Sequence, residues 1–388
     1  MVSQFKVNTG EIRSKLIIVF LFFFFLLGII QPACSITWIL LKGQLPDFEV
    51  YFQAAKAVLN GVSPYGNEAF TFNYPPTSLF LFIPFSLIPL FSGQIAWTIF
   101  SALCLGLAVY LLFKSLKWKP KLKEFLFLIP LIILSFPVKW TFGMGQIGSL
   151  ILLLLVITFV FYQEKKDLLA GIPLGSAIVL KLSPLLLLGL FLLKREWKLM
   201  IKTLIFVMLV NFLAVLVFGT QLTKDYFLKL GPSLVSPQGK WTYYNQALSG
   251  FVVRLIGEGH LAFLLTTFFS LLILGIIFAL SIRSKKVNHL NYSLVIISFL
   301  LVNSFSWQHH FVLMVFPFLT VFNFLKKRKT NNLSWLVLLT SYFLIAFNLK
   351  NPAVFQSSFL GPVILSHVFF GALILFAMIV YYLIKENG

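Results

Sequence analysis

A polar segment between Leu45 and Ala55 follows the first apolar run of the chain and carries Asp47 and Glu49. Only 11 of the 388 residues are Asp or Glu, and a carboxylate beside hydrocarbon is costly enough to be a functional candidate. Asp47 could accept the proton of a hydroxyl group as a general base. Asp is also a strong N-cap, so Asp47 could instead cap a helix that begins near Phe48.

Basic side chains that could face a phosphate group lie far from this segment in the sequence. Lys181 stands between two short apolar runs, and Arg254 follows a polar segment around residue 245. Both cations form strong charge-assisted hydrogen bonds with phosphate, and Arg can form two in parallel. Lys181 could also extend its ammonium group to the membrane interface without binding a ligand.

Two adjacent histidines, His309 and His310, stand at the start of a later apolar run. Neighbouring residues on an α-helix point about 100° apart, so we expect only one of them to face a common site. A single histidine in this position is usually satisfied by its surroundings, whereas an adjacent pair is harder to dismiss. The chain has no HExxH or CxxC motif and no carboxylate-rich cluster, so we expect no metal.

Further polar and aromatic residues fall in segments that we expect at the same membrane face. Tyrosines and tryptophans there could form only an aromatic belt at the interface, but their convergence from distant segments indicates one site. The candidates for substrate contacts are Tyr51, Tyr65, Tyr74, Gln146, Asn245, Gln246 and Trp307.

The composition indicates an integral membrane protein. The chain is 59% hydrophobic and 11% charged, whereas soluble domains are about 25% charged. The formal charge of +20 does not indicate nucleic-acid binding, because the basic residues form short clusters between apolar runs, as in cytoplasmic loops. Cys34 and Cys104 both fall inside predicted spans, which argues against a disulfide framework.

The apolar runs predict about 12 transmembrane helices in a single domain over residues 1–388. Alternate connections carry 22 of the 31 Lys and Arg residues, so we expect these connections and both termini in the cytoplasm. The first run is too long for a signal peptide, and we expect it to be retained. The predicted spans are 15–41, 94–113, 125–138, 147–163, 167–181, 184–195, 199–218, 261–283, 288–305, 309–325, 333–349 and 360–384.

Residues 76–91 form a further apolar run, but a span there would place the basic run 114–123 outside. The run is short and contains three prolines, so we predict a re-entrant or interfacial pair of helices covered by protein. The outer face then has two large loops, 42–93 and 219–260, which we expect to form the roof of the active site with juxtamembrane helices.

The sequence contains no P-loop, no dinucleotide fingerprint and no nucleophile elbow, and we expect no cofactor. An enzyme that works on the outer face cannot use cytoplasmic nucleotide donors. A polyprenyl-phosphate sugar is the natural alternative, with its phosphate held by Lys181 and Arg254.

Five segments in a fixed order now resemble a known family. Their order and spacing are similar to those of glycosyltransferase family 87, the polyprenol-phosphate-mannose-dependent mannosyltransferases with the GT-C membrane fold. The segments are 47–65 with 72–76 and the Pro84–Pro89 hairpin, 143–146, 170–184, 244–254 and 307–310.

The resemblance covers about residues 40–325 and implies an inverting transfer without a nucleotide donor. It implies that Asp47 is the catalytic base, and that Lys181, Arg254, His309 and His310 line the donor and acceptor pocket. One departure is Ala247, which stands where the family often has Ser; we do not infer lost activity from it.

We therefore expect a membrane glycosyltransferase that moves a hexose, with mannose as the first candidate, to a lipid-linked or glycan acceptor among the membrane lipids. A protein-glycosylating or lipid-A-modifying relative is an alternative within the same fold, although no soluble acceptor-binding domain is evident. A lipid or glycan transporter would show inverted repeats and broken helices at the midplane, and we find no repeat. A structural membrane protein would not need the converging Asp, Lys, Arg and His residues.

Overall fold

The computed structural model describes residues 9–43, 45–66, 71–234, 239–283 and 286–387. Within these residues, the only extended pairing is an isolated antiparallel bridge between Asn245 and Trp307. The predicted all-α class is confirmed. Lys6 and Lys285, two of the basic residues used for the predicted topology, lie outside the described residues.

The elements fall into two runs along the chain. The first run is α1 (Thr9–Leu41), α2 (Pro46–Leu59), η1 (Pro76–Ser78), α3 (Leu79–Ser86), α4 (Leu90–Ser115), α5 (Leu122–Leu134), α6 (Phe136–Met144), α7 (Gly148–Gln163), α8 (Asp167–Leu180), η2 (Ser183–Leu185), α9 (Leu186–Leu193) and α10 (Trp197–Phe218). The second run is α11 (Thr220–Lys224), η3 (Asp225–Leu230), α12 (Gly231–Leu234), α13 (Leu248–Ile256), α14 (His260–Arg283), α15 (His289–Val302), η4 (Gln308–Met314), α16 (Val315–Arg328), α17 (Asn332–Ala346), η5 (Pro352–Phe355), α18 (Gly361–Ile364) and α19 (His367–Asn387).

All twelve predicted spans coincide with helical segments, and several helices are apolar enough to cross a membrane. By length, six described helices qualify, and α5 with α6 adds a seventh if the bent pair is one span. The other five predicted spans are helices of at most 17 residues. The long helices are Leu16–Thr37, Leu90–Ser115, Trp197–Phe218, His260–Arg283, Gln308–Arg328 and His367–Glu386.

The predicted span 125–138 is bent in the structure. The axes of α5 and α6 meet at 53°, and Ser135 between them is extended, with ψ 136°. Pro137 lacks an N–H group, and its ring would clash with the carbonyl of residue 133 in a continuous helix. The helix therefore ends before Pro137, which becomes an early residue of α6.

Residues 76–91 do not form a long helix, in agreement with the prediction. The apolar helix Pro76–Ser86 is short, and the chain then turns at Pro89 into α4, which begins at Leu90 rather than at the predicted residue 94. The Thr77 hydroxyl donates to the carbonyl of Val179 at 2.5 Å, so this hairpin packs on the end of α8.

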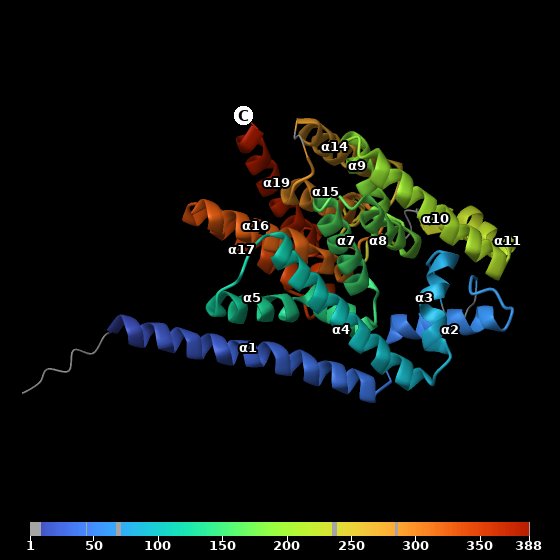
Figure 1. Ribbon diagram of the computed structural model, residues 1–388, viewed down its shortest axis with the longest axis horizontal. Helices are drawn as coiled ribbons and strands as arrows, with labels where there is room; N and C mark the ends of the chain where they lie inside the picture. The colour runs from blue at the N-terminus through green and yellow to red at the C-terminus, as the bar shows by residue number, and fades with distance from the viewer. Residues whose placement is uncertain (1–8, 44, 67–70, 235–238, 284–285, 388) are drawn as a thin grey trace, which may run out of the picture.

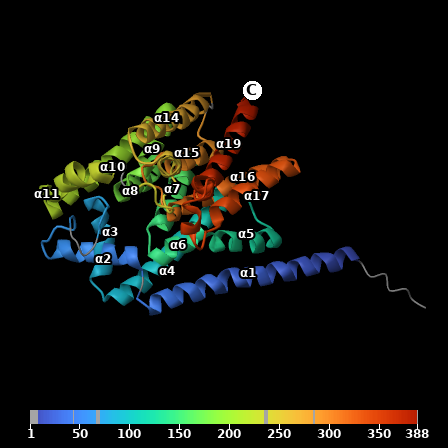
Figure 2. The same ribbon diagram turned by 180° about the vertical axis from the view of Figure 1, so that it is seen from behind.

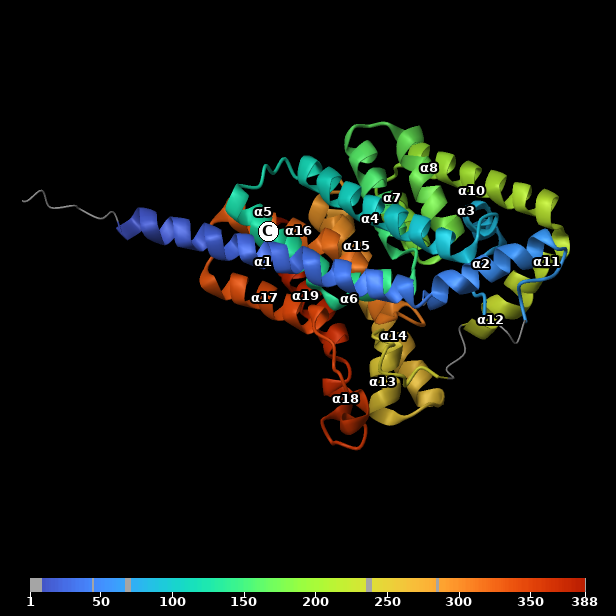
Figure 3. The same ribbon diagram turned by 90° about the horizontal axis from the view of Figure 1, so that it is seen from below.

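The long helices lie around a group of short buried ones (Figure 1). Residues of α7 and α15 are mostly buried, whereas α1, α10 and α14 are mostly exposed. Figure 1 shows α2, α3 and α11 together at one end of the molecule, and the view from behind agrees (Figure 2). Seen from below, α13 and α18 lie side by side (Figure 3).

The basic connections meet at the opposite end from α2. Lys326 pairs with Glu124, and the Lys327 ammonium group donates to the carbonyl of Leu116 at 3.0 Å. The Tyr162 hydroxyl donates to Glu196 at 2.8 Å. The first two contacts join the end of α16 to α5 and to the end of α4, and the third joins the end of α7 to the connection before α10.

Candidate active site

Helix α2 positions Asp47 at its first turn. Pro46 is the first residue of the helix, where its missing N–H group is harmless, and acidic residues there complement the helix dipole. The N-cap residue is Leu45, and no side chain caps the helix, so the capping alternative for Asp47 is wrong. Glu49 is exposed on another face of α2, while Asp47 is partly buried.

The side-chain amide of Gln146 links Asp47 to two tyrosines. Its nitrogen donates to the Asp47 carboxylate at 2.5 Å. Its oxygen lies 3.0 Å from the hydroxyl groups of both Tyr51 and Tyr74, which are also 3.0 Å from each other. Because the oxygen accepts from phenols, the amide must present its N–H group to Asp47.

A glycine and an aromatic cluster fix this glutamine. Gly145, at the end of α6, has a φ of +72°, and a Cβ there would lie 2.6 Å from the Cβ of Phe48, so the turn requires glycine. The indole of Trp97 donates to the Gly145 carbonyl at 2.7 Å. The Tyr51 ring stacks on Phe82 at 4.3 Å. The turn that carries Gln146 is thus held against α2 and α4.

Lys181 and His310 form the second part of the site. Lys181 follows the end of α8 in an extended conformation, and its Nζ lies 2.5 Å from Nε2 of His310 and 5.9 Å from the centre of the Tyr74 ring. If the ammonium group donates, Nε2 of His310 carries the lone pair and its proton is on Nδ1.

The two parts influence each other electrostatically. Burial raises the pKa of Asp47, while the hydrogen bond from Gln146 and the charge of Lys181 lower it. Lys181 lies between α8 and η2, outside the helices, and burial lowers the pKa of its ammonium group to about 7, against the opposing effect of Asp47. Both groups therefore titrate closer to neutral pH than usual, as expected at reactive sites.

His309 points elsewhere, as expected for one of two adjacent histidines. Its ring lies 5.5 Å from Trp140, edge to face, and neither ring nitrogen has a hydrogen-bond partner. The Thr141 hydroxyl donates to the His309 carbonyl at 3.0 Å and so ties η4 to α6. In the described part of the chain, no three His, Cys, Asp or Glu residues are grouped for a metal ion.

Three aromatic rings extend from His309. Trp140 lies 4.6 Å from Tyr244, and Tyr244 stacks with Trp307 at 6.3 Å. Trp307, a predicted substrate contact, is partly exposed, as are the other two. Trp140 and Tyr244 also belong to the aromatic residues that we expect at this membrane face, but they are not among the predicted substrate contacts, because a single aromatic residue at an interface cannot be told from a belt residue by sequence.

Asn245 and Gln246 are fully buried and bonded within the protein. The Asn245 side chain accepts from the backbone N–H of Ser306 at 3.1 Å, and the Gln246 side chain donates to the carbonyl of Leu365 at 2.7 Å. They hold the 239–247 connection against the segment before η4. Both side chains are closed off from solvent, and their role in substrate contact stays a prediction.

Arg254 lies apart from Asp47 and Lys181 in the network of contacts. Its guanidinium donates to the carbonyls of Thr242 and Asn245, both at 2.9 Å, and to the Ser366 hydroxyl at 2.9 and 3.1 Å. Burial lowers its pKa to about 10, so it remains charged at neutral pH. The structure thus brings Lys181 and His310 together but leaves Arg254 in a separate cluster.

Tyr65, also predicted to contact substrate, contacts the backbone of Tyr74. Its hydroxyl donates to the carbonyl of Tyr74 at 2.9 Å, and its ring lies 5.8 Å from Tyr226 of η3. Tyr65 therefore connects Tyr74 with the segment after α10.

Two hollows meet close to Lys181, at Ser183, Phe299 and Asn303. A small one is lined by Gln146, Lys181 and His310, together with Ser183, Phe299 and Asn303. These last three residues also line a larger hollow of about 470 Å³, here called the α14 groove, which runs along α14 past Thr266 and Ser270. The polar centre is thus continuous with a mostly apolar groove.

Comparison with known proteins agrees with this architecture. The chain matches the family model described as "Glycosyltransferase family 87" over residues 70–304, more than half of its length. It is 24% identical over 321 residues to a polyprenol-phosphate-mannose-dependent alpha-(1-2)-phosphatidylinositol mannoside mannosyltransferase of Mycobacterium tuberculosis, covering 74% of this chain and 71% of the relative. The chain is therefore a polytopic membrane protein of the GT-C type, and it belongs to glycosyltransferase family 87.

Proposed function

We propose that this glycosyltransferase transfers a hexose from a polyprenyl-phosphate donor to a lipid-linked acceptor with inversion at the sugar carbon. The observation that carries the proposal is the placement of a partly buried carboxylate, Asp47, and a partly buried cation, Lys181, around Gln146, next to a mostly apolar groove. A base and a phosphate-binding cation are the two charges that this reaction needs.

Asp47 acts as the general base. An acceptor hydroxyl oxygen forms a bond to the anomeric carbon while the bond from that carbon to the phosphate oxygen breaks. The hydroxyl proton passes to the Asp47 carboxylate, and polyprenyl phosphate leaves with the bonding electrons. The N–H group of Gln146 fixes the carboxylate, whose second oxygen can face the acceptor.

Lys181 and His310 bind the donor phosphate. Negative charge increases on the phosphate as the bond to the sugar breaks, and a fixed cation stabilises that charge in the transition state. When the donor binds, the Lys181 ammonium group donates a hydrogen bond to a phosphate oxygen, either in place of its contact with His310 or in addition to it. Arg254, with its donors used inside the protein, instead stabilises the 239–247 connection.

The α14 groove accommodates the polyprenyl chain of the donor. It shares Ser183, Phe299 and Asn303 with the hollow at Lys181, so a chain in the groove would begin where the phosphate is bound. Its volume of about 470 Å³ is within the usual range of about 300–1,000 Å³ for ligand sites.

The aromatic rings of Trp140, Tyr244 and Trp307 offer flat apolar surfaces for sugar rings. They form a continuous row of rings that begins next to His309. Sugar contact at this surface accounts for their partial exposure, and the predicted contacts Tyr51 and Tyr74 then position Gln146 from the other side.

The reaction takes place on the outer face. Basic connections at the ends of α4, α7 and α16 meet at the end opposite α2, and short basic connections mark the cytoplasm. This orientation puts both termini inside. The 42–93 and 219–260 loops cover the outer end.

The relative's name supports mannose as the sugar and a phosphoinositol-type glycolipid as a model for the acceptor. The test is incubation of purified protein with polyprenyl-phosphate mannose, polyprenyl-phosphate glucose and a nucleotide-activated mannose, each with native lipid extract. We expect transfer from polyprenyl-phosphate mannose. Transfer from the nucleotide donor alone would contradict the proposal, and Asp47→Asn provides the inactive control.

A further inference from the structure

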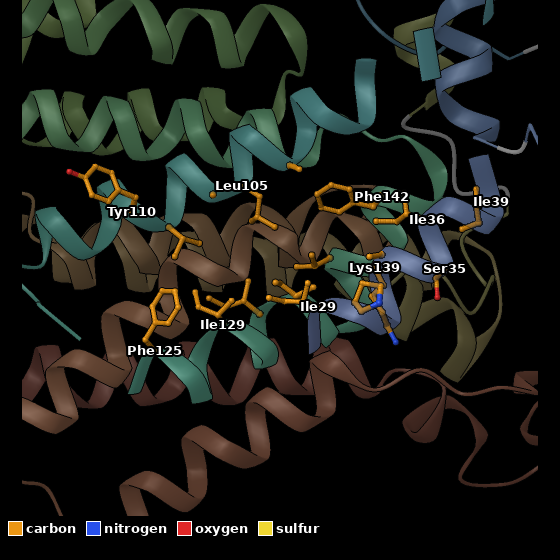
Figure 4. Close-up of a pocket in the computed structure, with 18 of the residues that line it drawn as sticks. Ile29, Ser35, Ile36, Ile39, Leu105, Tyr110, Phe125, Ile129, Lys139 and Phe142 are labelled. Carbon is orange, nitrogen blue, oxygen red and sulfur yellow. The ribbon is translucent and has the colours of Figure 1, made fainter. Parts of the chain in front are cut away.

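A second groove lies between α1 and helices α4, α5 and α6 (Figure 4). This α1 groove has a volume of about 550 Å³ and is lined by apolar side chains such as Ile36, Leu105, Ile129 and Phe142. Its one charged lining residue is Lys139 of α6. Figure 4 shows Lys139 near Ser35 and Ile36, and Tyr110 and Phe125 at the other end.

The groove is held open by the way α1 docks. Gly28 allows α1 to approach α5 so closely that a Cβ there would lie 2.6 Å from the Cβ of Pro130, and the rings of Phe25 and Phe125 are 5.7 Å apart. Helix α1 therefore packs on α5 and leaves the space beside α4 unfilled. In agreement with this, a Cβ on Gly106 of α4 would meet no atom within 4 Å.

The dimensions match one leaflet of a bilayer. The lining residues of α1 run from Ile29 to Ile39, which corresponds to about 15 Å of helix, or half of the roughly 30 Å hydrocarbon core. Lys139 is partly buried, and none of the described contacts engages its ammonium group. A cation at the headgroup end of an apolar groove complements an anionic lipid.

The groove is close to the proposed base. Lys139 and Phe142 belong to α6, which ends at Met144, two residues before Gln146 and about 8 Å along the helix from Lys139. Gly143 of the same helix lies against Ile39 of α1. A headgroup bound at Lys139 would therefore lie one or two sugar rings from Asp47.

We propose that the α1 groove binds the acyl chain of the acceptor, and that the acceptor is a phosphate-bearing lipid whose phosphate pairs with Lys139. The proposal rests on the proposed glycosyl transfer. It assigns donor and acceptor chains to two grooves that share no lining residue, so both lipids can be bound at once.

Photo-labelling measures occupancy of the groove independently of catalysis. The full-length protein in nanodiscs is exposed to phosphatidylglycerol or phosphatidylcholine with a diazirine in one acyl chain, and labelled peptides are mapped. We expect phosphatidylglycerol to label 29–39 and 102–110 preferentially, with the preference lost in Lys139→Gln and retained in Lys350→Gln. Equal labelling by both lipids, unchanged in Lys139→Gln, would show ordinary membrane lipid in the groove and overturn the proposal.

A filled groove tests the assignment to the acceptor. Gly106→Phe should raise the acceptor KM by about tenfold or more, because excluding a few methylene groups is enough for that change, and should leave the donor KM unchanged. The matched control is Gly275→Phe on α14, where a Cβ also meets no atom within 4 Å. An unchanged acceptor KM in a Gly106→Phe protein that no longer labels would refute the assignment. Absent transfer in the unmodified protein would instead refute the proposed function.

Discussion

Replacing Gln146 with Leu removes the hydrogen-bond donor that the structure places 2.5 Å from the Asp47 carboxylate. This bond lowers the pKa of Asp47 and so opposes the effect of burial, which raises it. Without the donor, the carboxylate is protonated over a wider range of pH. Because a general base must be deprotonated, the acidic limb of the pH–rate profile should move to higher pH.

The size of the shift follows from the bond that is lost. A hydrogen bond to a charged group contributes about 1.5–3 kcal/mol, and about 1.4 kcal/mol corresponds to one pKa unit. Asp47 is only partly buried, so water replaces part of the lost bond and the lower end applies. We expect the acidic limb to shift by about one unit, so the variant loses activity at the acidic end of the profile.

The assay is the pH dependence of kcat/KM for sugar transfer at saturating donor, from about pH 5 to 9, a range that brackets ordinary general-base titrations. Gln94→Leu is the matched control, because Gln94 is also buried but bonds to the carbonyl of Gly43. A folded Gln146→Leu protein whose acidic limb stays at the wild-type pH would refute the assignment of Asp47 as the base.

Asp47→Asn should insert and bind donor but lose transfer by about 10²–10⁴-fold, whereas the exposed Glu49→Gln should retain activity; the two are compared by product formation per folded protein. The pH–rate profile should have an alkaline limb near the Lys181 pKa of about 7, where the ammonium group loses its charge. Lys181→Ala should raise the donor KM, and an unchanged donor KM would count against the phosphate role. Arg254→Lys should lower the melting temperature in detergent with little change in donor KM, because the planar fork is used within the protein; a selective rise in donor KM would restore a donor role. A cysteine introduced at Arg328 should react only with reagents that reach the cytoplasm, and one at Glu49 only from outside; the reverse pattern would overturn the topology.

Much of the fold follows from the sequence because apolar runs in lipid must form helices that satisfy their own backbone groups. The runs predicted α1, α10 and α14 closely. The prolines between residues 76 and 91 predicted that the chain turns there instead of forming one long helix. The bend at Ser135 was missed, although Pro137 carried the signal for it.

The site was predictable only in part. Asp47, Lys181 and Gln146 stood out because charged and amide groups are rare beside long apolar runs, and the structure places them together. Arg254 and Asn245 stood out for the same reason, and in the structure their polar groups bond within the protein. Buried polar groups that brace loops need the same residue types as groups that bind ligands, and only their hydrogen-bond partners distinguish the two uses.

The short inner helices set the depth of the chemistry in the bilayer. Helices α7 and α8 have 16 and 14 residues, about 24 and 21 Å, against a hydrocarbon core of roughly 30 Å. Their far ends meet the basic connections, so their near ends, next to Gln146 and Lys181, fall roughly 6–9 Å short of the opposite surface. In the proposed reaction, sugar transfer then proceeds below the headgroups, where little water competes with the acceptor hydroxyl. The low water content at this depth then suppresses hydrolysis of the activated sugar. In a thicker bilayer the same site should lie deeper below the headgroups, without a change in any of its residues.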